Sequence, residues 1–273
     1  MGNTQTRRKS RRRKTERRTL LLVLVVTLVA TACLGRVLLD HYYDRVGGTT
    51  VVSGDFQKSL ETFADQHHLS LDAWPQEMVD AVENNPELGE FVLNYPVKKD
   101  KTPVIDLSQY RNSETVPLLF QWDERWGYAD YSGGIIGFTG CGPTCLSMVS
   151  IYLRNNPDLT PRYIAEFSES HGYSAPGSGS KWSLISEGGK ELGMDVKELP
   201  LDRNLVMRNL EAGHPIICVM GPGDFTTTGH FIVLAGCEDG KIRINDPNSK
   251  ERSERLWDYD QIQSQIKNLW VFT

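Results

Sequence analysis

The stretch GFTGCGPTCLSMVSIYL, residues 137–153, places two cysteines four residues apart at the predicted start of a helix. Pro143 is typical of the first turn of a helix, where its missing N–H leaves no bond unmade. Cys141 would then face unpaired backbone N–H groups and the positive end of the helix dipole, which lower a thiol pKa. Cys145 lies one turn later among apolar residues, as a buried core thiol does. The pattern predicts that Cys141 is the reactive cysteine.

A nucleophilic cysteine needs a base, and the base needs a group that orients it. His230 opens the strand-like run FIVLAG, so its ring can project from the end of a sheet, and Asp246 ends the next run, KIRIND. If the two runs form a hairpin, Asp246 lies beside His230 and can fix its tautomer. Asn245 points to the opposite face by strand alternation and cannot share that role. Each histidine taken alone is also explained by a structural role.

The patterns around these residues change from helical to strand-like along the chain. Helical spacing of apolar residues extends over 142–155, 161–170 and 182–192, after an extended run VPLLFQW at 116–122. Strand-like runs follow at 194–199, 215–220, 229–237, 241–246 and 269–273. Helices followed by strands predict an α+β domain with a mostly antiparallel sheet.

The motifs VPLLFQWDERWG, GCGPTCLSM, GHFIVL and INDPNS, in this order and spacing, resemble the extracellular branch of cysteine peptidase family thirty-nine. That family is papain-like and related to the double-glycine leader peptidases of bacteriocin exporters, and the resemblance covers 116–273. It implies a papain-like fold with Cys141 as nucleophile, His230 as base and Asp246 as orienting carboxylate. It also implies that the Gln121 amide helps to stabilise the oxyanion. From the residues alone, Gln121 is equally explained as a turn cap.

Two features depart from the family pattern. Cys145 stands where the family often has alanine, and a second thiol there could trap Cys141 by oxidation. No transporter domain accompanies the peptidase-like region, so the resemblance does not imply leader removal coupled to export.

Charge is distributed unevenly along the chain. Residues 1–18 hold nine Lys or Arg and one Glu, whereas the other 255 residues have a net charge of −13. An acidic body argues against nucleic acid as a partner. The uncharged run 19–35, continued by apolar residues after Arg36, approaches the roughly 20 residues that cross a bilayer. Basic residues before such a run hold that side in the cytoplasm.

We therefore predict a basic cytoplasmic leader at 1–18, a transmembrane signal anchor at 19–39 and a stem at 40–55. The catalytic region would lie outside the cytoplasm, attached to the cell membrane by a single span. Cleavage after the small-residue run Ala30-Thr31-Ala32, or lipidation at Cys33, would instead give a secreted or lipid-anchored protein.

A short helical segment at 56–114 is predicted before the peptidase domain at 115–273. Pro75 and Pro86 are expected at helix starts and Pro96 beyond a helix end. The segment could be a spacer, a lid or a pro-segment, and the sequence does not choose among the three.

The function expected from these residues is that of a cysteine peptidase acting on a peptide or protein substrate, with no cofactor and no metal. A cell-wall amidase or transpeptidase with similar Cys–His chemistry and a non-catalytic surface module are the alternatives. Zinc held by Cys141, Cys145 and a histidine is disfavoured, because structural zinc usually takes a tighter C-x2-C spacing. Cys218 and Cys237 could form a disulfide in an oxidising compartment.

Overall fold

The computed structural model describes residues 53–273, which belong to a compact unit comprising 51–273. The predicted leader, the predicted anchor at 19–39 and all but the last residues of the predicted stem lie outside the described residues. Within 53–273, no helix combines the length and the apolar character needed to span a bilayer. Helix α2 (Ser53–His67) begins inside the predicted stem.

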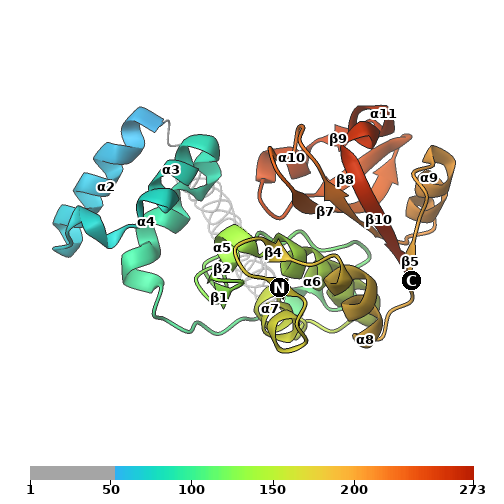
Figure 1. Ribbon diagram of the computed structural model, residues 1–273, viewed down its shortest axis with the longest axis horizontal. Helices are drawn as coiled ribbons and strands as arrows, with labels where there is room; N and C mark the ends of the chain where they lie inside the picture. The colour runs from blue at the N-terminus through green and yellow to red at the C-terminus, as the bar shows by residue number, and fades with distance from the viewer. Residues whose placement is uncertain (1–52) are drawn as a thin grey trace, which may run out of the picture. The chain divides into compact units, whose positions relative to one another are not determined.

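A six-stranded antiparallel sheet forms the centre of the peptidase-like region, in the order β5-β10-β6-β7-β8-β9 (Figure 1). Its strands are β5 (Val196–Glu198), β6 (Ile216–Met220), β7 (His230–Glu238), β8 (Lys241–Asn245), β9 (Leu256–Trp257) and β10 (Ile266–Phe272). The predicted antiparallel sheet is confirmed, and each of the five strand-like runs overlaps one strand. Strand β9 is not predicted, because two residues are too few to show alternation.

Helices cover both faces of this sheet. Helices α6 (Cys141–Arg154) and α7 (Pro161–Ser170) share a hydrophobic core with Phe231 and Val233 of β7. Helix α9 (Arg203–Glu211) shares a second core with the alternate residues of β7, Ile232 and Leu234. Strands buried on both faces read as continuous apolar runs rather than alternating ones. The sequence predicts α6 and α7 but not α9.

The remaining elements are α3 and α4 together with short helices and two-residue strands. In the first half of the chain they are η1 (Leu71–Ala73), α3 (Gln76–Asn84), η2 (Pro86–Leu88), α4 (Gly89–Lys98), η3 (Ser108–Tyr110), β1 (Asp130–Tyr131), β2 (Gly134–Ile135) and α5 (Ile136–Thr139). In the second half they are β3 (Ser174–Ala175), β4 (Gly179–Ser180), the π-helix η4 (Leu184–Gly188), α8 (Gly189–Glu191), α10 (Lys250–Glu254), α11 (Tyr259–Ile262) and η5 (Gln263–Gln265). The predicted helix at 182–192 is thus a π-turn followed by one short α-turn.

The predicted helix end before Pro96 is wrong, because Pro96 lies inside α4. A proline cannot donate to the carbonyl four residues earlier, which here belongs to Val92. The indole Nε1 of Trp74 donates to that carbonyl at 2.8 Å. The buried acceptor is therefore satisfied from outside the helix, and the helix continues past the proline.

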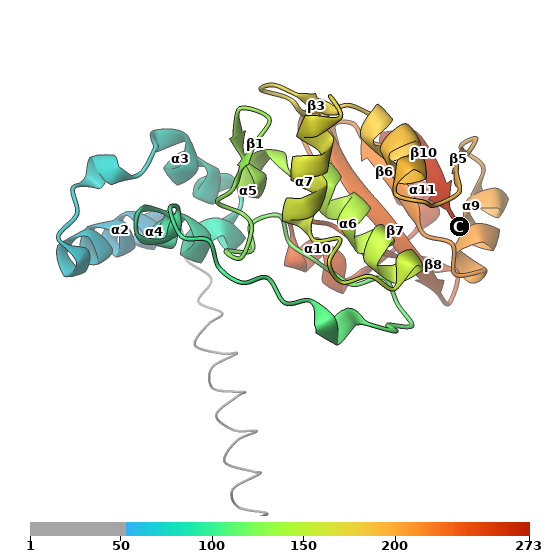
Figure 2. The ribbon, with the colours of Figure 1, turned by 90° about the horizontal axis from the view of Figure 1, so that it is seen from below.

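Helices α2, α3 and α4 lie together (Figures 1 and 2), and their buried side chains share a hydrophobic core with Tyr128. Phe91 of α4 stacks on Tyr128 with ring centroids 4.4 Å apart and an interplanar angle of 8°. The Tyr128 hydroxyl also donates to the Phe91 carbonyl at 2.8 Å. The helical segment, defined here as α2–α4, is thereby joined to the region that precedes Cys141.

Candidate active site

Cys141 is the first residue of α6, and Gly140 is its N-cap. Its side chain is half-buried, and its thiol is free. A Cβ atom added to Gly142 would lie 2.4 Å from the Ser180 hydroxyl, so the backbone beside the thiol is packed closely against β4. The glycine is required by this close approach.

His230 is the first residue of β7, and Asp246 directly follows β8. The two strands form a hairpin in which Val233 pairs with Asn245. Nε2 of His230 lies 2.8 Å from Oδ1 of Asp246, with the histidine 8 % exposed and the aspartate fully buried. The hairpin therefore brings together the two residues that the sequence analysis pairs.

The second oxygen of Asp246 faces a cation that the sequence analysis missed. Nε of Arg252, on α10, donates to Oδ2 of Asp246 at 2.6 Å. The backbone N–H of Asn248 donates to Oδ1 at 2.8 Å, and the Asp246 N–H donates to the Ser253 hydroxyl at 2.9 Å. Both oxygens of the buried carboxylate are thus bonded, and no side-chain pattern in the sequence indicates Arg252.

The electrostatics of the three predicted catalytic side chains are coupled. Burial would raise the pKa of the Cys141 thiol, but the hydrogen bond and charge of His230 lower it below its ordinary value. Burial would lower the pKa of His230, but the Asp246 carboxylate and the Cys141 thiol raise it to about 10. Burial would raise the pKa of Asp246, but His230 and Arg252 hold it below its usual range. The arrangement favours a thiolate, an imidazolium and a carboxylate.

Gln121 is buried, with 3 % of its surface exposed. Its Nε2 donates to the Gly137 carbonyl at 2.9 Å, and its backbone N–H donates to the Pro247 carbonyl at 2.8 Å. Its Oε1 has no hydrogen-bond partner within residues 53–273. Gln121 thus contacts the residue that follows Asp246 and a residue shortly before Cys141.

Asn245 has a different position from Asp246. Its Nδ2 donates to the carbonyls of Val116, at 3.2 Å, and Pro117, at 3.0 Å. Asn245 therefore holds the extended segment that leads to Gln121, and it is Asp246 that faces His230, as strand alternation predicts.

The other cysteines of the described residues differ from Cys141 in their surroundings. Cys145 is fully buried, and burial together with the neighbouring Cys141 raises its pKa well above the ordinary value. Cys218 is fully buried in β6, and Cys237 is half-buried in β7. Both are free, so the disulfide that the sequence left open is not formed. Over the part of the chain that the structure describes, no three metal-ligating side chains gather into a site.

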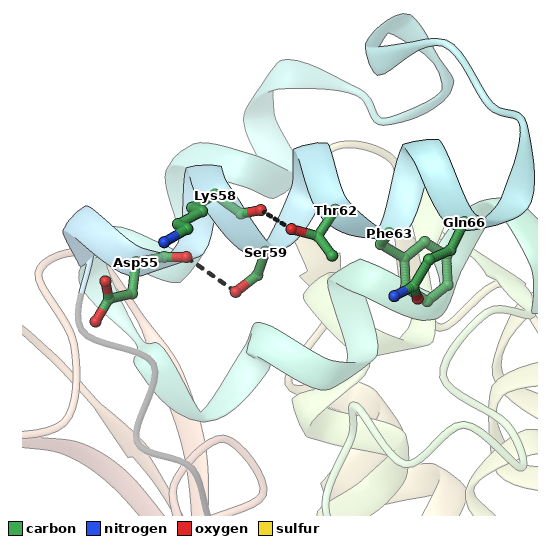
Figure 3. A pocket seen from close by; sticks show the side chains of 6 residues that line it. All are labelled: Asp55, Lys58, Ser59, Thr62, Phe63 and Gln66. Carbon is green, nitrogen blue, oxygen red and sulfur yellow. Dashed lines mark hydrogen bonds between the residues drawn. The ribbon is translucent and has the colours of Figure 1, made fainter.

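A shallow hollow lies along α2, lined by Asp55, Lys58, Ser59, Thr62, Phe63 and Gln66 (Figure 3). Two of its hydroxyls bond to carbonyls of their own helix, Ser59 to Asp55 at 2.9 Å and Thr62 to Lys58 at 2.8 Å. These two hydroxyls therefore have hydrogen-bond partners within α2. None of the predicted catalytic residues lines the hollow.

Two similar solved structures are the peptidase domain of Streptococcus ComA, a bi-functional ABC transporter involved in a quorum-sensing pathway, and a putative C39-like peptidase from Bacillus anthracis. The first is 23 % identical with a TM-score of 0.36, and the match covers 49 % of this chain and 90 % of that one. The second is 17 % identical with a TM-score of 0.36, and the match covers 62 % of this chain and 96 % of that one.

The search of curated proteins finds no match to this sequence. Residues 113–272, which contain Cys141, His230, Asp246 and Gln121, match the Peptidase_C39 like family. The chain therefore belongs to the Peptidase_C39 like family.

Proposed function

We propose that this protein is a cysteine peptidase that cleaves peptide bonds through Cys141, His230 and Asp246. Membership of the Peptidase_C39 like family supports peptidase activity and a peptide substrate. The observation that carries the residue assignment is the 2.8 Å hydrogen bond between His230 Nε2 and the buried Asp246 carboxylate. It leaves the other ring nitrogen for the thiol of Cys141, whose pKa the histidine lowers.

The chemistry follows from this charge distribution. The Cys141 thiolate attacks the scissile carbonyl carbon, and the carbonyl oxygen becomes an oxyanion. The His230 imidazolium gives its proton to the leaving amine as the C–N bond breaks, which leaves an acyl-enzyme. His230 then takes a proton from water as the water oxygen attacks the thioester carbon. The C–S bond breaks, the acid product leaves, and the Cys141 thiolate stands again beside the His230 imidazolium. Asp246 stays ionised throughout and stabilises the imidazolium.

Two groups would stabilise the oxyanion in this scheme. The amide of Gln121 has two N–H donors, and one of them bonds the Gly137 carbonyl. The second is assigned here to the oxyanion, together with backbone N–H groups at the start of α6.

We also propose that the catalytic region acts outside the cytoplasm. The support is the sequence of nine basic residues followed by the uncharged run 19–35, which is typical of a signal anchor. Full-length protein that leaves membranes with detergent but not with alkali would support the anchor. A shorter form in the medium would show cleavage instead.

The test of the activity uses the full chain and a library of quenched-fluorescence peptides, extended with cell-wall stem peptides. We expect hydrolysis that Cys141→Ala and His230→Ala abolish and that Cys237→Ala, a half-buried free cysteine in β7, leaves unchanged. Alkylation of Cys141 by iodoacetamide near pH 6, lost in His230→Ala, should accompany it. No cleavage of any peptide, with a thiol that reacts as an ordinary cysteine, would contradict the proposal.

A further inference from the structure

The loop from Asp246 to Ser249 connects β8 to α10 and carries the carboxylate that faces His230. Side chains of the helical segment hold this loop from a distance of more than 160 residues along the chain. The Asn85 amide donates from Nδ2 to the Asn248 carbonyl at 2.8 Å. Asn248 in turn donates its backbone N–H to Oδ1 of Asp246 at 2.8 Å. One hydrogen-bonded residue therefore separates Asn85 from the carboxylate.

Glu87 binds the other end of the same loop. Its carboxylate accepts from the Ser249 hydroxyl at 2.8 Å, from the Lys250 N–H at 2.6 Å and from the Glu251 N–H at 3.2 Å. Three donors on one carboxylate fix both the loop end and the start of α10. Arg252, which donates to Asp246, lies on α10.

Asn85 and Glu87 act as one unit, because Oδ1 of Asn85 accepts from the Glu87 N–H at 3.2 Å and caps η2. The short helix η2 thus presents two polar side chains to one loop. Both residues precede the region 113–272 that matches the family.

A second contact joins the helical segment to the other side of the site. A Cβ atom added to Gly137 would lie 2.5 Å from the Phe91 ring, and one added to Gly127 would lie 2.7 Å from it. Phe91 therefore packs directly on the backbone of Gly137, whose carbonyl accepts from Gln121. The segment contacts the residue that holds Gln121 as well as the loop that holds Asp246.

We propose that Asn85 and Glu87 are positioning residues for the proposed peptidase site, holding the Asp246 loop and α10 in the geometry in which Asp246 faces His230 and Arg252. The inference rests on the proposed function. It makes the helical segment a fixed part of the active site, in contrast to a spacer, a lid or a removable pro-segment. Without either contact the Asp246 carboxylate is no longer aligned with His230. The charged forms of His230 and Cys141 are then less stabilised.

The experiment compares Asn85→Ala and Glu87→Ala in the full chain with two matched controls. Asn84→Ala removes an amide that bonds only its own helix, and Glu83→Ala removes an exposed carboxylate of α3. Cys141 alkylation by iodoacetamide is measured from pH 5 to 10, and the melting temperature is measured at pH 7. Each unit of increase in the thiol pKa lowers the thiolate fraction about tenfold on the acid side.

We expect Glu87→Ala and Asn85→Ala to shift the alkylation midpoint to higher pH and to reduce the rate at pH 6 about tenfold. Glu87→Gln keeps one acceptor oxygen at the same length but sets an amide donor against a loop donor, so it should restore the rate only in part, and the controls should match wild type. A lowered melting temperature with an unchanged midpoint would overturn the inference alone. Wild-type alkylation that does not depend on His230 would overturn the proposed function and the inference with it.

Discussion

Arg252 donates from Nε to Oδ2 of Asp246 at 2.6 Å, on the carboxylate oxygen that His230 does not use. One buried carboxylate therefore faces two cationic groups, one on each oxygen. A buried charge is tolerated when it is paired and hydrogen-bonded, and Asp246 meets both conditions. The consequence is that Asp246 has a charged partner even when His230 loses its proton.

Asp246→Asn tests the orienting role of the carboxylate. The substituted amide has one acceptor and one donor, and Arg252 claims the acceptor, so the donor faces Nε2 of His230. Two donors then oppose each other, and the required tautomer is lost. We expect peptide hydrolysis to fall about 100-fold or more. The measurement is kcat beside that of Asp239→Asn, an exposed aspartate in the β7–β8 turn, which should behave as wild type.

Arg252→Ala tests how much the second cation contributes. Removing the charged donor from a buried carboxylate should reduce the free energy of unfolding by about 1.5–3 kcal/mol. Hydrolysis should fall less than in Asp246→Asn, because the bond between Asp246 and His230 remains. The contrast is Arg203→Ala, which breaks an exposed ion pair with Asp260 at 3.1 Å and should change stability by less than about 1 kcal/mol. Urea denaturation of wild type, Arg252→Ala and Arg203→Ala measures the free energy of unfolding of each. An equal loss of stability in the two variants would contradict the prediction.

The pH dependence of stability follows from opposite pKa shifts in one pair. Because folding raises the pKa of His230 to about 10, the stability it contributes is full below pH 6.5 and is lost as the pH rises through about 10. Folding lowers the pKa of Cys141, so its contribution is full above the ordinary thiol value and lost as the pH falls through the folded value. Between these limits the contributions of His230 and Cys141 to the free energy of unfolding change with pH in opposite directions and offset each other.

Cys141→Ala should reveal the pH dependence that His230 alone gives to the free energy of unfolding. With the thiol removed, Asp246 still raises the pKa of His230, and the offsetting proton release on folding is gone. The unfolding free energy of the variant should decline from pH 7 to 9 more steeply than that of wild type, by at most about 1.4 kcal/mol per pH unit. Chemical denaturation at several pH values measures both curves, and parallel curves would show that the two groups are not coupled.

Gly142→Ala tests the close packing beside the nucleophile. The added methyl group would lie 2.4 Å from Oγ and 2.8 Å from Cβ of Ser180, so we expect a loss of about 1–3 kcal/mol. In a Ser180→Gly background the obstacle is gone, and alanine should then stabilise the helix, because its propensity exceeds that of glycine. A double-mutant cycle from thermal unfolding gives the sign of the Gly142→Ala effect in each background. The same sign in both would contradict the packing argument.

Local patterns were sufficient to place the candidate residues that lie at the ends of helices and strands. Pro143 identifies the start of α6 and hence the position of Cys141, because proline fits only the first turn. Glycine and proline delimit the strands that begin at His230 and end before Asp246. Gln121 is different, because the residues around it did not distinguish a turn cap from a site residue. Its assignment came from the family resemblance.

The remaining contacts depend on residues distant in sequence. Arg252 reaches Asp246 from a five-residue helix that is too short to produce a periodic pattern. Asn85 and Glu87 meet the same loop across more than 160 residues, and nothing local indicates their partners. Pro96 shows the same limit, because only the distant indole of Trp74 explains why α4 continues past it.

The position of β10 has a consequence for synthesis of the chain. Strand β10 spans Ile266–Phe272, yet it lies between β5 and β6, which precede it by about fifty residues or more. The place between β5 and β6 thus stays unfilled on the ribosome until residue 272 has emerged, since non-local strand pairing waits for its last partner. His230 lies on β7, which pairs with β6, so the strand beside that of His230 lacks its other neighbour until then. We expect a nascent chain that lacks β10 to have no peptidase activity, because β5 and β6 then have no strand between them.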